Sequence, residues 1–260
     1  MGFPRIRTRL LLGSAAILLT VALAGCKSTG LTDTTGSIAM PSGARTEAEY
    51  RRDIDNYGPR YRANSRDADA AIRYAWALRG IGQRAQAAAV LEQASFVSPK
   101  NSALLGAYGR ALADAGSFQQ ALEVLNRAHS PDQPDWRILS VQGAVLDQMG
   151  RHEEAQSYYT SALRIVPDEP SVLSNLGLSY ALAKNLPQAE ETLRRASGKG
   201  RTDPRVRQNL ALVVGLQGRF AEAETIARAD LPAEQAAANV GYLREMLAQP
   251  NNLKRQQRAG

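Results

Sequence analysis

The 260-residue sequence predicts an all-α protein, a solenoid of about five helix pairs followed by a capping helix. The first observation is a small residue that returns every 34 positions, at Ala87, Ala121, Ala155, Ala189 and Ala223. A second series keeps step five positions earlier, at Gly82, Gly116, Gly150, Lys184 and Gly218. A fixed period of this length is typical of stacked helix pairs. The repeats are therefore expected at 68–101, 102–135, 136–169, 170–203 and 204–237.

Each repeat is expected to form two amphipathic helices joined by a glycine turn. In the third repeat the bulky apolar residues fall at helical spacing, at Leu139, Leu146, Tyr158, Tyr159 and Leu163. Gly150 stands where the end of a helix favours a positive φ. One such pair cannot cover its own apolar stripe, whereas stacked neighbours can, so stability is expected to build up along the array.

Further helices are predicted on both sides of the repeats. Before them, 46–67 is expected to hold one helix over Glu47–Tyr57, which Gly58-Pro59 would end. After them, 233–249 carries apolar residues at helical spacing and predicts a terminal helix that covers the last apolar face. We assign 238–260 to this capping helix and a polar tail.

The repeat resembles the tetratricopeptide repeat. The family pattern L-G-x-x-Y of the first helix is present as Leu176-Gly177-Leu178-Ser179-Tyr180, and Ala155 with Tyr159 matches the pattern of the second helix. Pro99 and Pro167 stand where the family closes a repeat, whereas the second repeat departs from the pattern at Ser130–Pro134. The resemblance implies a right-handed solenoid.

Residues 1–25 are predicted to be a lipoprotein signal peptide. Three arginines precede an apolar run, Leu10–Ala24, that is too short for a comfortable membrane span. The run ends in Leu23-Ala24-Gly25-Cys26, which resembles the bacterial lipobox, in which the cysteine is lipidated. Cys26 is the single cysteine of the chain, which suits attachment rather than a disulfide. The alternative is an ordinary secretory signal with Ala22-Leu23-Ala24, cut before Gly25.

The resemblance to lipoproteins also indicates a location. Lys27 stands where an aspartate favours retention in the inner membrane, so we expect a lipid anchor at the periplasmic face of the outer membrane. Acyl chains contribute about 0.8 kcal/mol per buried CH₂ to such anchoring. Residues 26–45 are rich in Thr, Ser and Gly and are predicted to form a flexible tether.

Charge and residue patterns exclude several classes of function. The chain has 32 Lys and Arg against 25 Asp and Glu, and without the signal peptide the net charge is about +4. Because the basic residues are scattered and export is predicted, nucleic acid is not an expected partner. The two histidines, His129 and His152, lack the spacing of a catalytic triad or a metal pair. We therefore expect no enzyme activity, no cofactor, no metal and no small-molecule substrate.

The tetratricopeptide resemblance implies a concave groove lined by the first helices, in which a partner protein binds. Its candidate residues are Trp76, Arg79, Arg110, Asp114, Arg137, Asp147, Asn175, Arg205, Gln208 and Asn209. Trp76 suits either of two roles, an anchor for a partner side chain or packing against the helix at 47–57. Asn175 and Asn209 occupy equivalent positions and can bond a peptide backbone. The Lys/Asn set with which some family members grip a C-terminus is incomplete.

The lipobox, the tether and the five repeats together resemble the TadD family of lipoproteins of the tight-adherence (Flp) pilus assembly system. Matching segments include 107–112, 141–150, 174–180 and 207–218. The resemblance implies a pilotin, an outer-membrane lipoprotein that binds the pilus secretin and helps it to insert and oligomerise. The alternative is a periplasmic lipoprotein scaffold that recruits cell-wall hydrolases or other envelope proteins.

Overall fold

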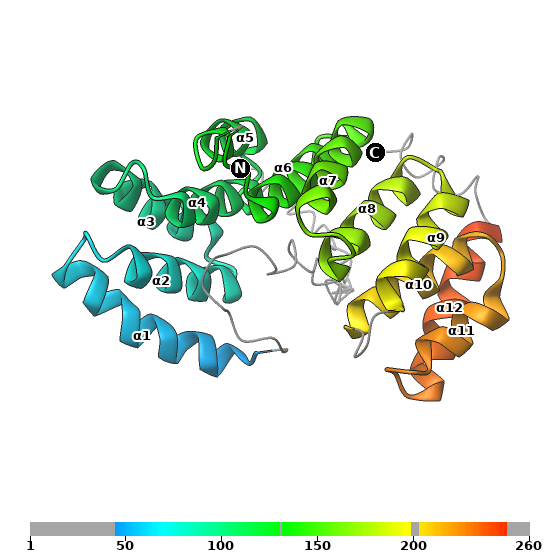
Figure 1. The fold of residues 1–260 in the computed structure, drawn as a ribbon. Helices are drawn as coiled ribbons and strands as arrows, with labels where there is room; N and C mark the ends of the chain where they lie inside the picture. Colours follow the sequence, from blue (N-terminus) through cyan, green and yellow to red (C-terminus); the bar gives the residue numbers. More distant parts are fainter. Residues whose placement is uncertain (1–44, 131, 199–202, 249–260) are drawn as a thin grey trace, which may run out of the picture. The chain divides into compact units, whose positions relative to one another are not determined.

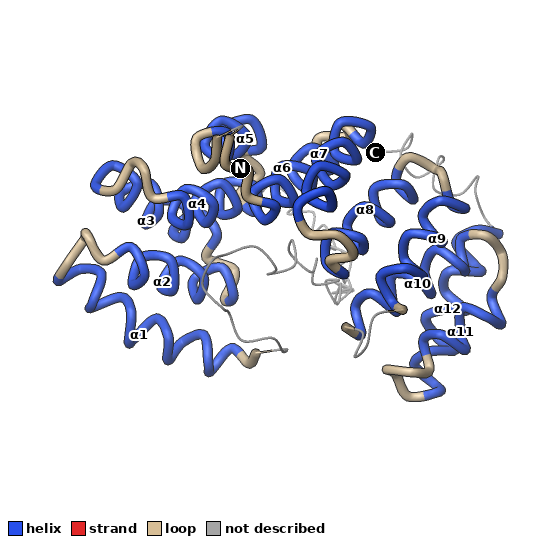
Figure 2. Tube along the Cα trace, viewed as in Figure 1, coloured by secondary structure: helices blue, strands red, loops and turns tan. Residues whose placement is uncertain are grey.

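The computed structural model describes residues 45–130, 132–198 and 203–248, and these residues form an all-α solenoid (Figures 1 and 2). They contain twelve helices and no strand. The predicted all-α fold class is therefore confirmed. The signal peptide, Cys26, almost all of the tether and the end of the polar tail are predictions that lie outside the described residues.

Ten of the helices form five antiparallel pairs in chain order (Figure 1). The pairs are α2 (Ala68–Gly80) with α3 (Arg84–Val97), α4 (Ser102–Asp114) with α5 (Phe118–Asn126), α6 (Trp136–Gln148) with α7 (His152–Ile165), α8 (Pro170–Leu182) with α9 (Leu186–Ser197), and α10 (Pro204–Leu216) with α11 (Phe220–Ala227). Each helix packs on the next one along the chain.

The two series of small residues have different physical roles. The repeated alanines, from Ala87 to Ala223, are fully buried between helices. Gly82, Gly116, Gly150 and Gly218 end the first helices with φ between 75° and 83°, the left-handed region that glycine adopts without steric cost. In the fourth repeat Lys184 adopts the same turn with φ of 64°. The turn therefore forms even where its preferred residue is absent.

A third series with the same period stands at the start of the first helices. Asp67, Asn101, Asp135, Glu169 and Asp203 each accept a hydrogen bond from a backbone N–H of the first turn. Such caps satisfy donors that have no partner within the helix. Capping thus marks every first helix at the point where the previous repeat ends.

The N-terminal helix is longer than the sequence predicts. Helix α1 (Glu47–Ala63) begins with a capping box between Thr46 and Glu49 and runs straight through Gly58-Pro59. The predicted end at Gly58-Pro59 was therefore wrong. An interior proline removes one helical hydrogen bond, and its ring crowds the carbonyl four residues earlier. Burial of Gly58 and Tyr61 against α2 offsets this cost, so the helix continues beyond the proline.

The chain of described residues ends with α12 (Ala233–Ala248), which packs on α10 and α11. Its buried side is formed by Ala236, Val240 and Leu243. Leu243 reaches Gly215 so closely that a Cβ there would lie 2.5 Å from the Leu243 side chain. Helix α12 therefore caps the last apolar face of the solenoid.

Candidate protein-binding face

The first helices of the units share one face. Helix α2 contacts α4, and the series continues through α6, α8 and α10 to α12. No comparable contact joins the second helices of neighbouring units in the described part of the chain. We call the surface built by α2, α4, α6, α8, α10 and α12 the first-helix face. It is the surface on which the sequence analysis placed its candidate residues.

Several of these candidates link neighbouring units to each other. Arg79 of α2 forms an ion pair with Asp114 of α4, with 2.5 Å between Nε and Oδ2, and both side chains are largely buried. The amide of Asn175 donates to the hydroxyl of Ser140 at 3.3 Å, and that of Asn209 to the hydroxyl of Ser174 at 3.0 Å. These groups hold one first helix on the next, so the fold itself uses their polar atoms.

Asp147 joins the third unit to the fourth. Its carboxylate accepts hydrogen bonds from the Tyr159 hydroxyl at 3.0 Å and the Ser179 hydroxyl at 2.8 Å, and it lies 2.8 Å from Nδ1 of His152. Burial, with the Asp147 carboxylate beside it, raises the pKa of Tyr159 well above its ordinary value. A buried carboxylate is stable when donors surround it in this way, so Asp147 is a structural centre.

The sequence left two roles open for Trp76, an anchor for a partner side chain or packing against the N-terminal helix. In the structure Trp76 packs against that helix. It is only 8% exposed, and its ring meets that of Tyr50 of α1 edge-on, with centroids 5.0 Å apart. The Arg45 guanidinium lies 4.7 Å from the Trp76 ring and also pairs with Asp53. This cluster fixes the start of α1 on the first-helix face. Arg110, in the next unit, is likewise buried.

The remaining candidates are more accessible. Arg137 lies with its guanidinium 4.5 Å from the Trp136 ring, and exposed Arg205 pairs with Asp203 at 2.7 Å. Gln208 is exposed and borders a pocket near the end of the solenoid. The structure thus distributes the predicted residues over five helices, and among them Gln208 lines a pocket.

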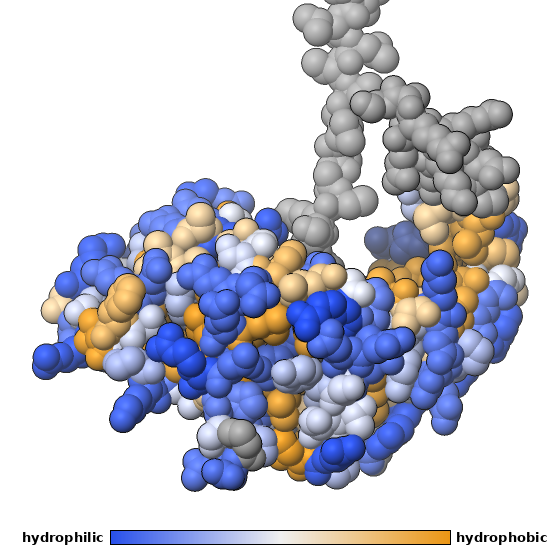
Figure 3. All heavy atoms as spheres, turned by 90° about the horizontal axis from the view of Figure 1, so that it is seen from above, coloured by the Kyte–Doolittle hydropathy of each residue, from blue (hydrophilic) through white to orange (hydrophobic). Residues whose placement is uncertain are grey.

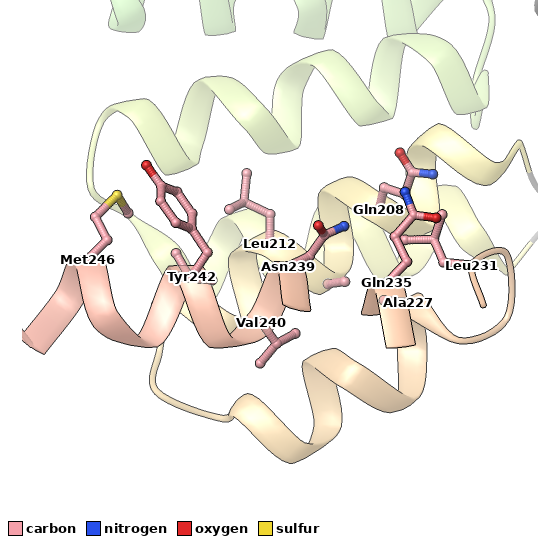
Figure 4. Close-up of a pocket in the computed structure, with 11 residues that line it drawn as sticks. Gln208, Leu212, Ala227, Leu231, Gln235, Asn239, Val240, Tyr242 and Met246 are labelled. Carbon is pink, nitrogen blue, oxygen red and sulfur yellow. The ribbon is translucent and has the colours of Figure 1, made fainter. Parts of the chain in front are cut away.

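The pocket lies where α10, α11 and α12 meet, and we call it the terminal pocket (Figure 4). Its volume is about 440 Å³, within the range of ligand-binding clefts. Its lining consists of Gln208, Ala211, Leu212, Ala227, Leu231, Gln235, Asn239, Val240, Tyr242, Leu243 and Met246. Sequence reasoning missed it because α12 was interpreted only as a cap, although Tyr242 and Met246 do not share the buried side of Val240 and Leu243.

Large apolar side chains of the terminal pocket are open to solvent. Leu212 is 43% exposed, Tyr242 72% and Met246 38%. On the side of the molecule that Figure 3 displays, hydrophobic patches are interspersed with hydrophilic residues. A cluster of exposed large apolar groups beside a concavity is a common mark of an interaction site.

The described residues lack two features that would indicate another kind of site. They hold no group of three or more His, Cys, Asp or Glu residues that could bind a metal ion. None of their helices is long and apolar enough to cross a membrane. The lining of the terminal pocket carries no formally charged side chain.

One curated protein and several solved structures are similar to this chain. The BBSome complex member BBS4 of Bos taurus is 25% identical over 142 residues, which are 55% of this chain and 27% of that protein. The crystal structure of PilW, a widely conserved type IV pilus biogenesis factor, superposes with a TM-score of 0.64 at 16% identity, over 74% of this chain and 91% of PilW. PilF of Pseudomonas aeruginosa superposes with a TM-score of 0.55 at 20% identity, over 78% of this chain and 97% of PilF. These structures share the fold.

Family models identify the repeats directly. Three models described as tetratricopeptide repeat match residues 39–167, 148–213 and 204–229. Together they run without a gap from the start of α1 to the end of α11. Members of this family bind other proteins through such solenoids. The chain belongs to the tetratricopeptide repeat family.

Proposed function

We propose that this protein is a lipid-anchored lipoprotein of the outer membrane, facing the periplasm, that binds a partner protein on its first-helix face. Its role is to assist assembly of the tight-adherence (Flp) pilus as a pilotin for the secretin. One combination of features carries the proposal. A sequence that resembles a lipobox ends at Cys26 and precedes a tetratricopeptide solenoid, and segments of the chain resemble the TadD lipoproteins.

The solved structures that share the fold support this proposal. PilW is described as a type IV pilus biogenesis factor, and PilF superposes along nearly its whole length. Like this chain, both are tetratricopeptide solenoids of moderate size. A role in building a pilus across the envelope therefore comes to this chain by analogy of fold, together with its own signal-peptide and lipobox pattern.

A division of labour follows from the two parts of the chain. The solenoid presents a continuous face on which an extended or helical segment of a partner can lie across several units. The lipid at Cys26 holds that complex at the target membrane and raises the effective concentration of secretin subunits there. The first-helix face sets specificity and Cys26 sets location.

The experiment compares secretin multimers in outer-membrane fractions from three strains. One strain makes the protein, one lacks it, and one makes the Cys26→Ser variant. We expect the multimers to vanish or to shift to the inner membrane in the second and third strains. Blots of the variant protein control for its amount.

Two results contradict the proposal in different ways. Unchanged multimers in the strain that lacks the protein exclude the pilotin role and direct the search to cell-wall hydrolases as partners. Multimers that depend on the protein but form normally with Cys26→Ser leave the binding role and exclude the proposed anchoring.

A further inference from the structure

We propose that the terminal pocket binds an extended, uncharged and apolar segment of the partner protein, whose backbone is read by the side-chain amides of the pocket. This inference deepens the proposed function and rests on it in one respect, that the ligand is a protein. It assigns a place on the first-helix face and a chemical class of segment.

The amides of the terminal pocket differ from the two asparagines that the sequence placed at equivalent positions of α8 and α10. Asn175 and Asn209 donate to serine hydroxyls of the preceding unit and so serve the fold. In the described residues the side chains of Gln208, Gln235 and Asn239 make no hydrogen bond to the rest of the protein. All three are exposed. Three carboxamides at the pocket thus have their donors and acceptors available to a ligand beside an apolar surface.

A carboxamide suits a peptide backbone because it offers both a donor and an acceptor. It can pair with the N–H and the C=O of an extended segment, whatever the side chains of that segment are. Leu212, Tyr242 and Met246 supply the apolar surface beside these amides. In Figure 4, Tyr242 and Met246 lie toward one end of α12, and Gln208 and Gln235 lie near one another toward the other end.

The spacing along α12 sets the length of the segment. Gln235, Asn239, Tyr242 and Met246 follow one another at intervals of four, three and four residues, which places them on one stripe of the helix. At 1.5 Å per residue the stripe is about 16 Å long. An extended segment rises about 3.3 Å per residue, so about five of its residues lie along the stripe.

The charge of the pocket sets the composition of the segment. No lining residue is charged, and two nearby arginines already have acidic partners, Arg205 with Asp203 and Arg207 with Asp230. A charged side chain would lose water here without gaining an opposite charge. The segment is therefore uncharged over the residues that enter the pocket, with bulky apolar side chains among them.

The test uses a phage library of random nonapeptides, panned on the full chain purified in detergent from cell envelopes. We expect the selected peptides to share an uncharged core with large apolar residues. Their synthetic copies should bind Asn239→Leu at least fivefold more weakly, although this variant is more apolar. Binding to the matched control Asn56→Leu, an exposed amide on α1, should be unchanged.

Methylation of the backbone nitrogens in the core of the selected peptides distinguishes hydrogen bonding to the peptide backbone from purely hydrophobic binding. It removes hydrogen-bond donors and adds apolar surface. We expect it to abolish binding. Selection of charged peptides, selection of none, or peptides that bind Asn239→Leu and the methylated form as well as before would overturn the inference. Because this assay needs no secretin, its outcome is independent of the strain comparison that tests the pilotin role.

Discussion

Lys184 stands in a backbone conformation that the other four repeats give to glycine. Its φ of 64° belongs to the left-handed region, which costs a residue with a Cβ about 1 kcal/mol. We expect Lys184→Gly to stabilise the solenoid by about 0.5 kcal/mol, because part of the relief is offset by the larger entropy of glycine in the unfolded chain. Urea denaturation measures this change. Lys184→Ala keeps the strain and serves as the control, and a glycine variant no more stable than the alanine variant would contradict the account.

Buried tyrosines give the protein a sensitivity to alkali, and burial raises the pKa of Tyr61 as well as those of the two considered next. Burial, with Glu92 as a second cause, raises the pKa of Tyr108 to about 12, and burial raises the pKa of Tyr159 well above the usual value. The unfolded chain releases these protons near pH 10 while the folded chain keeps them. Stability is therefore complete below about pH 10 and falls as the pH rises toward 12.

Absorbance at the tyrosinate wavelength measures this directly. We expect Tyr108→Phe and Tyr159→Phe each to remove a late-titrating component from the folded protein and to flatten the loss of stability above about pH 10. Tyr242→Phe, a substitution of an exposed tyrosine on α12, serves as the matched variant outside the core. Tyr61 should still supply a late component in these variants, so the prediction is contradicted if neither substitution reduces the late-titrating absorbance.

At the scale of the element, close contact between paired helices depends on glycines inside them. A Cβ at Gly177 of α8 would lie 2.6 Å from Cγ of Leu193 and 3.2 Å from the Ala189 carbonyl oxygen of α9. Gly241 of α12 has nothing within 4 Å of the same point. Both glycines lie inside helices, but an added methyl group would clash at Gly177 and would meet open space at Gly241.

We expect Gly177→Ala to destabilise the solenoid by about 1–3 kcal/mol through overpacking. Gly241→Ala is expected to stabilise it by about 0.5–1 kcal/mol, because alanine favours the helix. Thermal unfolding followed by circular dichroism measures both. If the two variants shift the midpoint in the same direction, the close contact of α8 with α9 does not decide the outcome.

The elements also show why sequence predicts some features and not others. The alanines and turn glycines recur at a fixed spacing, and each has one physical role, so the helix pairs could be predicted from the chain alone. Helix α1 could not, because its continuation through Pro59 depends on burial against α2. Local rules for proline describe an isolated helix, whereas packing between helices decided this one.

Candidate residues were harder to assign for a related reason. The tetratricopeptide pattern indicates which side chains belong to the first-helix face. It does not indicate whether those side chains already form hydrogen bonds or ion pairs with other residues of the protein. Asp114, Asp147 and Asn209 all have partners within the fold. The terminal pocket arises from α10, α11 and α12 together, and its shape is absent from any one segment of the sequence.

At the scale of the whole molecule, the protein combines a repeat solenoid, a proposed lipid anchor and a pocket at the C-terminal end of the first-helix face. Exposed apolar residues also occur on the second helices, as at Phe96 of α3, which is 77% exposed. Apolar exposure alone therefore does not mark the binding site. What distinguishes the terminal pocket is a cavity in which unpaired amides stand beside apolar side chains.

The most direct measurement is photocrosslinking in living cells with p-benzoylphenylalanine placed at Tyr242 or at Phe96. Both positions are exposed aromatics, one at the terminal pocket and one on a second helix. The account predicts a product with the pilus secretin from position 242 and none from position 96. Absence of that product at 242, or an equal product at 96, would contradict the claim that the secretin binds in the terminal pocket.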